Sequence, residues 1–145
     1  MLMEKPKRAV YTALIGNYDA LAPIAFNSEL DFFLFTDDAT LKVEGWKTVH
    51  IQSLSCVPEG PSWKVNRFLK LHPHKCLSDY SQTLYIDSNI ELLVDPEILF
   101  DRYIYHFDLS VALHTERYSI DKELEACVNS DKINESEFNL IRERI

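Results

Sequence analysis

The sequence predicts an α/β fold, in which a parallel sheet is flanked by helices. Three apolar segments, residues 9–15, 31–35 and 83–93, are rich in β-branched or aromatic side chains and alternate with turn and helical patterns. Each apolar run leads into polar residues, as strands do when their carboxyl ends open on a ligand crevice. The length of 145 residues is that of one domain, and we expect a single domain over residues 1–145.

Composition excludes several classes of partner and site. The net charge of −8 argues against a broad surface for nucleic acid or anionic membranes, so an anionic ligand would need a local cationic cluster. No segment approaches the ~20 apolar residues of a membrane span. The three cysteines, Cys56, Cys76 and Cys127, lack Cys-x-x-Cys spacing, which is typical of free thiols in a reducing compartment. We therefore expect a cytoplasmic protein.

Residues 9–15 predict the first strand, and Gly16 begins a loop with strong turn chemistry. The loop offers an amide at Asn17, an aromatic ring at Tyr18 and a carboxylate at Asp19. This set is suited to stacking on a base and accepting hydrogen bonds from a sugar. On the residues alone, an ordinary solvated loop is the better explanation.

Residues 31–35 predict a second buried strand, which continues into Asp37 and Asp38. Capping of a following turn and contact with a ligand explain these carboxylates equally well. Residues 46–51 predict a third strand at an edge of the sheet, with His50 as a surface histidine.

A helix is predicted over residues 63–71, after a proline-rich break and with Ser62 as its cap. Its apolar side is expected to consist of Trp63, Phe68 and Leu71. The histidines that follow, His72 and His74, flank a proline and are expected to be loop residues.

Lys64, Arg67 and Lys70 recur at a spacing of three on this helix, which places their charges on one face. In an acidic chain they form the local basic cluster that an anionic ligand such as a diphosphate requires. The alternative is a solvated charged face.

The segment 83–93 is interrupted at its middle by Asp87, Ser88 and Asn89. A strand that ends in an ionised carboxylate points to a ligand or a metal, because burial of an unpaired charge is costly. We therefore expect a strand that delivers Asp87 and Asn89 to a site. The alternative is a simple turn, which all three residue types favour.

Further elements are predicted in the last third of the chain. A helix begins at Pro96 behind the cap Asp95, and residues 108–114 predict a strand whose polar end would lie beside Asp87. Residues 120–128 predict a helix, and residues 134–145 predict a final amphipathic helix.

Four segments in order, residues 11–19, 64–67, 70–74 and 85–90, together resemble a GT-A glycosyltransferase. They resemble more closely the capsule-biosynthesis and plant mucilage family of glycosyltransferase-like domains. The resemblance implies a Rossmann-like sheet that binds a nucleotide sugar. It also implies a divalent cation, usually manganese, that bridges the diphosphate to the protein.

The resemblance also implies a role for each site residue. Asn17, Tyr18 and Asp19 would contact the nucleoside, and Asp37 the ribose or base. Lys64, Arg67, Lys70 and Ser88 would complete the donor site, with Arg67 and Lys70 at the diphosphate. Asp87 and Asn89 would occupy the Asp-x-Asp metal position, and His114, Arg117 and Glu123 would approach the sugar or acceptor, with Glu123 a candidate general base.

Two departures from the family pattern keep the function open. Asn89 supplies a neutral oxygen where an aspartate would supply charge, so metal dependence is in question. GT-A enzymes commonly continue through an acceptor-binding half, so a minimal enzyme, a fragment and a donor-binding domain are all consistent with this chain. The leading prediction is transfer of a sugar to a glycan or other hydroxyl acceptor, as in surface polysaccharide synthesis. The alternatives are a non-catalytic nucleotide-sugar-binding or assembly module and, less favoured, a structural domain.

Overall fold

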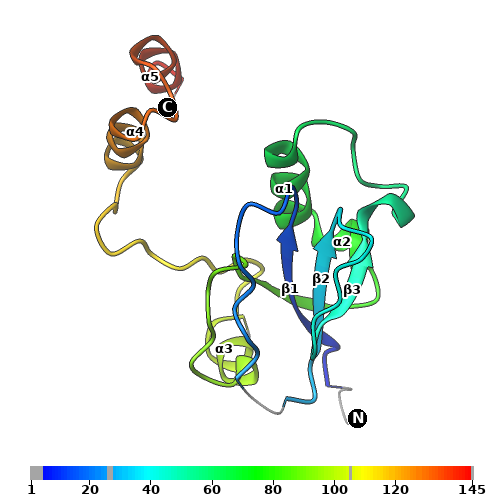
Figure 1. Cartoon of the computed structure of the whole chain (residues 1–145). Coiled ribbons are helices and arrows are strands. Elements are labelled where there is room, and N and C mark those ends of the chain that lie inside the picture. The colour runs from blue at the N-terminus through cyan, green and yellow to red at the C-terminus, as the bar shows by residue number, and fades with distance from the viewer. Residues whose placement is uncertain (1–4, 26–27, 105, 145) are drawn as a thin grey trace. The chain divides into compact units, whose positions relative to one another are not determined.

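The computed structural model describes residues 5–25, 28–104 and 106–144, and within these ranges it contains four strands and five α-helices (Figure 1). The strands are β1 (Arg8–Leu14), β2 (Asp31–Thr36), β3 (Lys47–His50) and β4 (Gln82–Tyr85). The helices are α1 (Ser62–Leu71), α2 (Pro73–Cys76), α3 (Pro96–Tyr103), α4 (Ile120–Asn129) and α5 (Glu135–Arg142), with a 3-10 turn η1 at Ile51–Ser53. The chain divides into two compact units, Met1–Asp108 and Leu109–Ile145, and each is described by itself.

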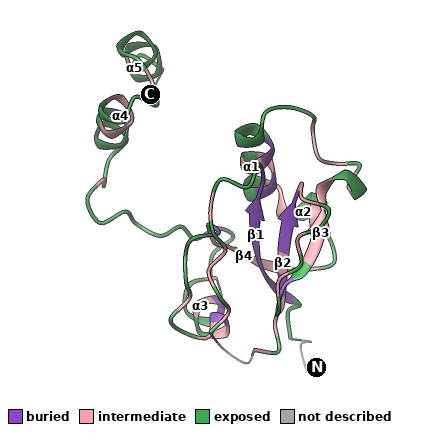
Figure 2. Ribbon diagram, in the orientation of Figure 1, coloured by how far each residue is buried: buried purple, intermediate pink, exposed green. Residues whose placement is uncertain are grey.

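The four strands form one parallel sheet in the order β3-β2-β1-β4. Val10 of β1 lies opposite Phe32 of β2 and Leu84 of β4, so β1 is central. All seven residues of β1 are buried (Figure 2), which explains its nearly continuous apolar sequence. The α/β prediction is confirmed, and the carboxyl ends of all four strands lie at one edge of the sheet.

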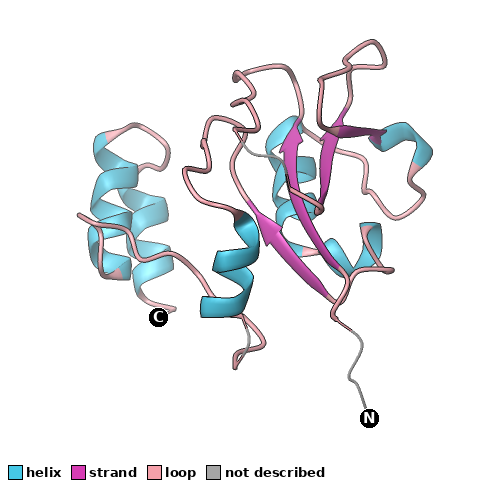
Figure 3. Cartoon of the chain, turned by 90° about the horizontal axis from the view of Figure 1, so that it is seen from below, coloured by secondary structure: helices cyan, strands magenta, loops and turns pink. Residues whose placement is uncertain are grey.

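Alternate residues of β1 serve two separate cores. Ala9, Tyr11 and Ala13 pack in one cluster with Val65 and Leu69 of α1. The intervening side chains belong to a second cluster, which contains Val10, Leu14, Phe32, Leu34, Trp46 and Phe100 of α3. The sheet therefore has helices on both faces (Figure 3). The hydroxyl of Tyr11 also donates to the backbone oxygen of Lys70 at 2.8 Å, which fixes α1 against β1.

A buried arginine joins three elements at the amino end of β1. The Arg8 side chain is only 4% exposed, and it forms ion pairs with Glu97 and, at 2.7 Å, with Asp101 of α3. Its Nε donates to Gln82 of β4 at 2.7 Å. Burial alone would raise the pKa of the Glu97 carboxyl, but hydrogen bonds from Lys5 and Arg8 outweigh it and lower the pKa. These partners offset the cost of burying the Arg8 charge, so that removal of one of them would leave a charge uncompensated.

Two predictions about α1 and its end were wrong. The buried residues of α1 are Val65 and Leu69, whereas Trp63 is 61% exposed. Leu71 is exposed as well. An i, i+4 pair faces the sheet, so the apolar side lies elsewhere on the helix than the sequence predicted. The predicted loop with His74 forms the short helix α2, which begins with a proline at its first position.

The predicted strand at residues 108–114 was also wrong. The alternation of Leu109, Val111 and Leu113 with smaller residues is a strand pattern, but all three side chains are exposed and the segment is irregular. A strand requires a neighbouring strand for its backbone groups, and the four strands of the described chain pair only with one another.

The two helices predicted near the end of the chain are confirmed in the second unit. Ser119 caps α4, and Asn134 and Glu137 form a capping box at the start of α5. Among the described residues, no helix is long and apolar enough to cross a membrane.

Candidate functional site

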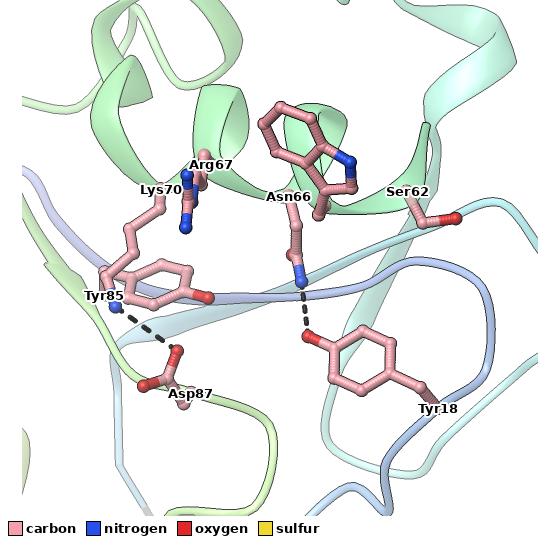
Figure 4. A pocket seen from close by; sticks show the side chains of 8 residues that line it. Tyr18, Ser62, Asn66, Arg67, Lys70, Tyr85 and Asp87 are labelled. Atoms are coloured by element: carbon pink, nitrogen blue, oxygen red, sulfur yellow. Dashed lines mark hydrogen bonds and ion pairs between the residues drawn. The ribbon is translucent and has the colours of Figure 1, made fainter. Parts of the chain in front are cut away.

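A pocket of about 610 Å³ lies at the carboxyl edge of the sheet, where the segments after β1 and β4 face α1 (Figure 4). Its volume is within the range of small-ligand sites. The lining residues are Tyr18, Ser62, Trp63, Asn66, Arg67, Lys70, Tyr85 and Asp87. Parallel α/β sheets place ligand sites at this edge.

The loop after β1 is held in place by the residue that follows β2. The backbone N–H of Gly16 donates to both carboxylate oxygens of Asp37, at 3.0 and 3.1 Å. Gly16 has a φ of +80°, and a Cβ there would lie 2.8 Å from the Ser62 hydroxyl oxygen. Asp37 thus positions the loop and is not among the lining residues, and its contact with a ribose or base stays a prediction.

Asn17 and Asp19, the other two candidate residues of the first loop, lie outside the pocket. Asn17 has a φ of +50° and is exposed, and the Asp19 carboxylate accepts from the backbone N–H of Ala20 at 2.9 Å. Neither is among the residues that line the pocket, whereas Tyr18 is. The structure therefore brings only the aromatic ring of this set to the site.

Tyr18 and Asn66 meet across the mouth of the pocket. The side-chain amide of Asn66 donates to the Tyr18 hydroxyl oxygen, as Figure 4 shows. The Asn66 Oδ1 atom is buried and has no hydrogen-bond partner among the described residues. It is therefore an unsatisfied acceptor, which a ligand N–H or O–H reaches only when the amide turns toward the pocket.

Arg67 and Lys70 supply the positive charge of the pocket. The Arg67 guanidinium lies 5.4 Å from the centre of the Trp63 ring, and Lys70 Nζ lies 4.7 Å from that of the Tyr85 ring. Lys64 is exposed and is not a lining residue, because a spacing of three falls short of the 3.6-residue turn and drifts around the helix. Arg67 and Lys70 are thus the cations that the structure places at the site.

Asp87 lies in a turn and lines the pocket as well. The N–H of Ile90 donates to the Asp87 backbone oxygen at 2.9 Å, so the turn alternative describes the backbone correctly. The carbonyl of buried Ser88 accepts from Ala22 N–H at 2.7 Å, which anchors this turn. The Asp87 carboxylate nevertheless points to the pocket and lies 3.3 Å from Lys70 Nζ. Asn89 is exposed and is not a lining residue.

Tyr85 is a protonated donor at this site. Burial, followed by the charge of Asp87, raises the pKa of the Tyr85 hydroxyl above its ordinary value. The hydroxyl therefore keeps its proton at neutral pH and can donate to an acceptor such as a phosphate oxygen.

The pocket contains one carboxylate that a metal ion could use. No group of three His, Cys, Asp or Glu side chains gathers in the part of the chain that the structure describes. A cation of the magnesium or manganese type can be held by one or two carboxylates, with substrate phosphates and water as its other ligands. Asp87 could serve as such a carboxylate ligand. The described lining residues do not provide the further ligands that a site made only of protein groups would need.

The remaining predicted residues gather in the second unit. An Arg117 guanidinium nitrogen lies 3.1 Å from the Glu123 carboxylate, and Arg117 Nε lies 3.1 Å from His114 Nε2. Glu123 belongs to the first turn of α4. The structure thus brings these three residues together, and their approach to a sugar or acceptor stays a prediction.

Four lining residues were missed from the sequence: Ser62, Trp63, Asn66 and Tyr85. On α1 a signal was available, because Ser62, Asn66 and Lys70 recur at a spacing of four, which keeps side chains on one helix face. Tyr85 is the last residue of β4, and only its neighbours in space identify it as part of the site.

Comparison with known proteins identifies a family for the chain. The model of one protein family, the TOD1/MUCI70 glycosyltransferase-like domain, matches residues 1–143. Searches of curated proteins and of solved structures gave no significant match. The family match confirms the resemblance to plant mucilage glycosyltransferase-like proteins. The chain therefore belongs to the TOD1/MUCI70 family of glycosyltransferase-like domains.

Proposed function

We propose that this chain binds a nucleotide sugar in the pocket at the carboxyl edge of the sheet and transfers the sugar to a hydroxyl acceptor. The observation that supports this most is the meeting of Arg67, Lys70 and Asp87 in one pocket of an otherwise acidic protein. Two cations suit a diphosphate, and the carboxylate suits a cation that accompanies it. The family match supports a glycosyltransferase-like role.

The diphosphate is proposed to lie against Arg67 and Lys70. The ion pair between Lys70 and Asp87 is half exposed, so its loss costs less than about 1 kcal/mol. Lys70 can therefore turn from the carboxylate to a phosphate. Asp87 would then hold a divalent cation, proposed to be manganese, which stabilises the leaving diphosphate. Asn89, at the second position of the motif, is proposed as a neutral and weaker ligand.

The nucleoside is proposed to contact the rim of the pocket. The rings of Tyr18 and Trp63 offer exposed faces on which a base can stack. The Oδ1 atom of Asn66, which is buried and unpaired, would accept a hydrogen bond from the base or ribose after the side chain turns toward the pocket. Asn17, Asp19, Asp37, Lys64 and Ser88 remain proposed donor-site residues whose contacts require a bound ligand.

Transfer with inversion needs a base that removes the proton of the acceptor hydroxyl. Glu123 is proposed for this role, with Arg117 and His114 as groups that orient it or contact the sugar. The acceptor is proposed to be a glycan, in the context of surface polysaccharide synthesis. The free thiols suggest a reducing compartment such as the cytoplasm.

A second function, binding without transfer, is favoured by one observation. The motif position that an aspartate would occupy is Asn89, which is exposed and does not line the pocket. A binding module predicts stabilisation by a nucleotide sugar with no turnover.

Thermal unfolding against a panel of nucleoside diphosphates and nucleotide sugars, each with and without manganese, tests binding. A ligand at a hundred times its dissociation constant stabilises the native state by about 2.7 kcal/mol. Selective stabilisation by one nucleotide family is the expected result. The absence of any shift would contradict both functions. Release of the nucleoside diphosphate from the selected donor then separates transferase from binding module.

A further inference from the structure

Two thiols that are twenty positions apart in the sequence lie next to each other in the fold. The Sγ atoms of Cys56 and Cys76 are 3.5 Å apart, and both side chains are half buried. Cys56 lies in the turn after η1, and Cys76 is the last residue of α2. The proposed function uses neither residue.

The backbone around both cysteines is fixed independently. Leu54 and Val57, on either side of Cys56, pack against the core cluster that α1 shares with the sheet, and Cys76 packs against the same cluster. The N–H of Leu54 donates to Ile51 at 3.0 Å, and the N–H of Leu77 donates to Pro73 at 2.7 Å. The closeness of the two sulfurs therefore follows from the packing of this face of the sheet.

We propose that Cys56 and Cys76 are a redox modification site, at which a small-molecule disulfide such as oxidised glutathione introduces a reversible intramolecular disulfide. A disulfide requires the sulfurs to approach to about 2.0 Å, which is a short movement from a distance of 3.5 Å. Disulfides in reducing compartments are usually transient and redox sensing, which suits a half-buried pair.

The exchange reaction balances without a further reactant. The thiolate of Cys56 attacks one sulfur of oxidised glutathione, whose S–S bond breaks, and one glutathione leaves as a thiol. The thiolate of Cys76 then attacks the Cys56 sulfur of the mixed disulfide and expels the second glutathione. The two protons from the protein thiols end on the two glutathione molecules. Burial raises the pKa of the Cys76 thiol, so the exchange should be faster at pH 8 than at neutral pH.

The disulfide would enclose the helix that lines the pocket. The closed loop runs from residue 56 to residue 76 and contains all of α1, hence Ser62, Trp63, Asn66, Arg67 and Lys70. A cross-link that closes a loop restricts the unfolded chain, so the oxidised protein should unfold at a temperature several degrees higher. Oxidation would thus restrain the donor-site helix.

The test treats the reduced full chain with oxidised glutathione at pH 8 and measures the thiol count and the intact mass. The remaining thiols are then blocked for a non-reducing peptide map. The expected thiol count falls from three to one. The mass should fall by two hydrogen atoms, and one peptide pair should join Cys56 to Cys76. Dithiothreitol should restore all three thiols and lower the melting temperature again.

Two variants separate the pair from other thiol chemistry. Cys127→Ser should still form the cross-link, because Cys127 lies outside the pair, and its thiol count should fall from two to none. Cys56→Ala should form no cross-link and show no oxidative rise in melting temperature. Three surviving thiols in the native protein, or a stable glutathione adduct on Cys56 or Cys76, would overturn the proposal. Because the readout needs no nucleotide, it is independent of the proposed function.

Discussion

Lys70 Nζ lies 3.3 Å from Asp87 Oδ1 and so connects the last turn of α1 to the turn after β4. Both side chains are about half exposed, and ion pairs of this kind contribute little to stability. The pair therefore contributes little to the stability of the fold. Under the proposed function it is the point at which a phosphate, or a cation that accompanies it, would exchange with a protein group.

Lys70→Ala should weaken binding of a nucleoside diphosphate about tenfold to a hundredfold. The expected loss corresponds to one hydrogen bond between charged groups, about 1.5–3 kcal/mol. Isothermal titration calorimetry measures it. Lys42→Ala is the control, because it removes the same charge from an exposed position outside the pocket. Equal losses in both variants would show that only overall charge matters and would contradict a phosphate site at Lys70.

Substitutions of Asp87 and Asn89 should change manganese binding in opposite directions. Asp87→Asn should abolish the manganese-dependent part of nucleotide binding, because it removes the only carboxylate among the described lining residues. Asn89→Asp should strengthen manganese binding by adding a charged oxygen. Titration of each variant with nucleotide, with and without manganese, measures how much manganese changes the dissociation constant of the nucleotide. Manganese dependence that survives in Asp87→Asn would exclude Asp87 as a ligand.

The ring of Tyr18 should contribute more to nucleotide affinity than its hydroxyl group does. Tyr18→Phe loses only the hydrogen bond with Asn66, about 1 kcal/mol or less at this exposed position. Tyr18→Ala also loses the stacking surface, worth about 1–3 kcal/mol for a base. The affinity for a nucleoside diphosphate should therefore fall from the wild type to Tyr18→Phe and fall further in Tyr18→Ala. Tyr118→Ala, an exposed tyrosine of the second unit, is the control.

Arg8→Met should lower the free energy of unfolding by about 2–3 kcal/mol. The substitution leaves Glu97 and Asp101 without their buried cation and removes the hydrogen bond to Gln82. Denaturant titration measures the loss. Arg102→Met on the same helix as Glu97 removes an exposed arginine and should change stability by less than about 0.5 kcal/mol. A similar loss in both variants would contradict the role assigned to Arg8.

Stability should fall in acid because three carboxyl groups, those of Asp31, Asp38 and Glu97, have a lowered pKa in the folded protein. Hydrogen bonds from Lys47 and Tyr80 lower the pKa of Asp31, and those from Lys5 and Arg8 lower that of Glu97. A lowered folded pKa contributes stability above the unfolded pKa, near 4, and that contribution disappears as the pH falls through the folded pKa.

The free energy of unfolding should therefore decrease from about pH 5 downwards. Glu97→Gln should show a shallower decrease over the same range, because the group that titrates is gone. An unchanged acid slope in that variant would contradict the assignment to Glu97.

Most of the sheet could be predicted from the sequence, whereas contacts between residues that are distant in the sequence could not. β1 and β2 were predictable because buried parallel strands are nearly continuous apolar runs. The segment 109–113 has the same local character, yet pairing depends on a neighbouring strand, which no local pattern reports. The closeness of Cys56 and Cys76 is likewise a product of packing.

The candidate site was predictable in part for the same reason. Tyr18 and Asp87 lie in the segments that follow β1 and β4, and Arg67 and Lys70 share a helix face. Their positions relative to the pocket therefore follow from local geometry. Trp63 was expected on the apolar side of the helix, and only the packing of Val65 and Leu69 shows that this side lies elsewhere. The roles of Asp37 and Asn89 stay predictions.

The central claim is that the pocket beside α1 binds a nucleoside diphosphate, and amide chemical shifts of the isotope-labelled chain test it most directly. Titration with the nucleotide that stabilises the protein best should move signals in three segments, residues 16–19, 62–70 and 85–89. The Lys70→Ala variant should show smaller shifts at equal concentration. Shifts confined to other segments, or none at saturating nucleotide, would contradict a donor site in this pocket.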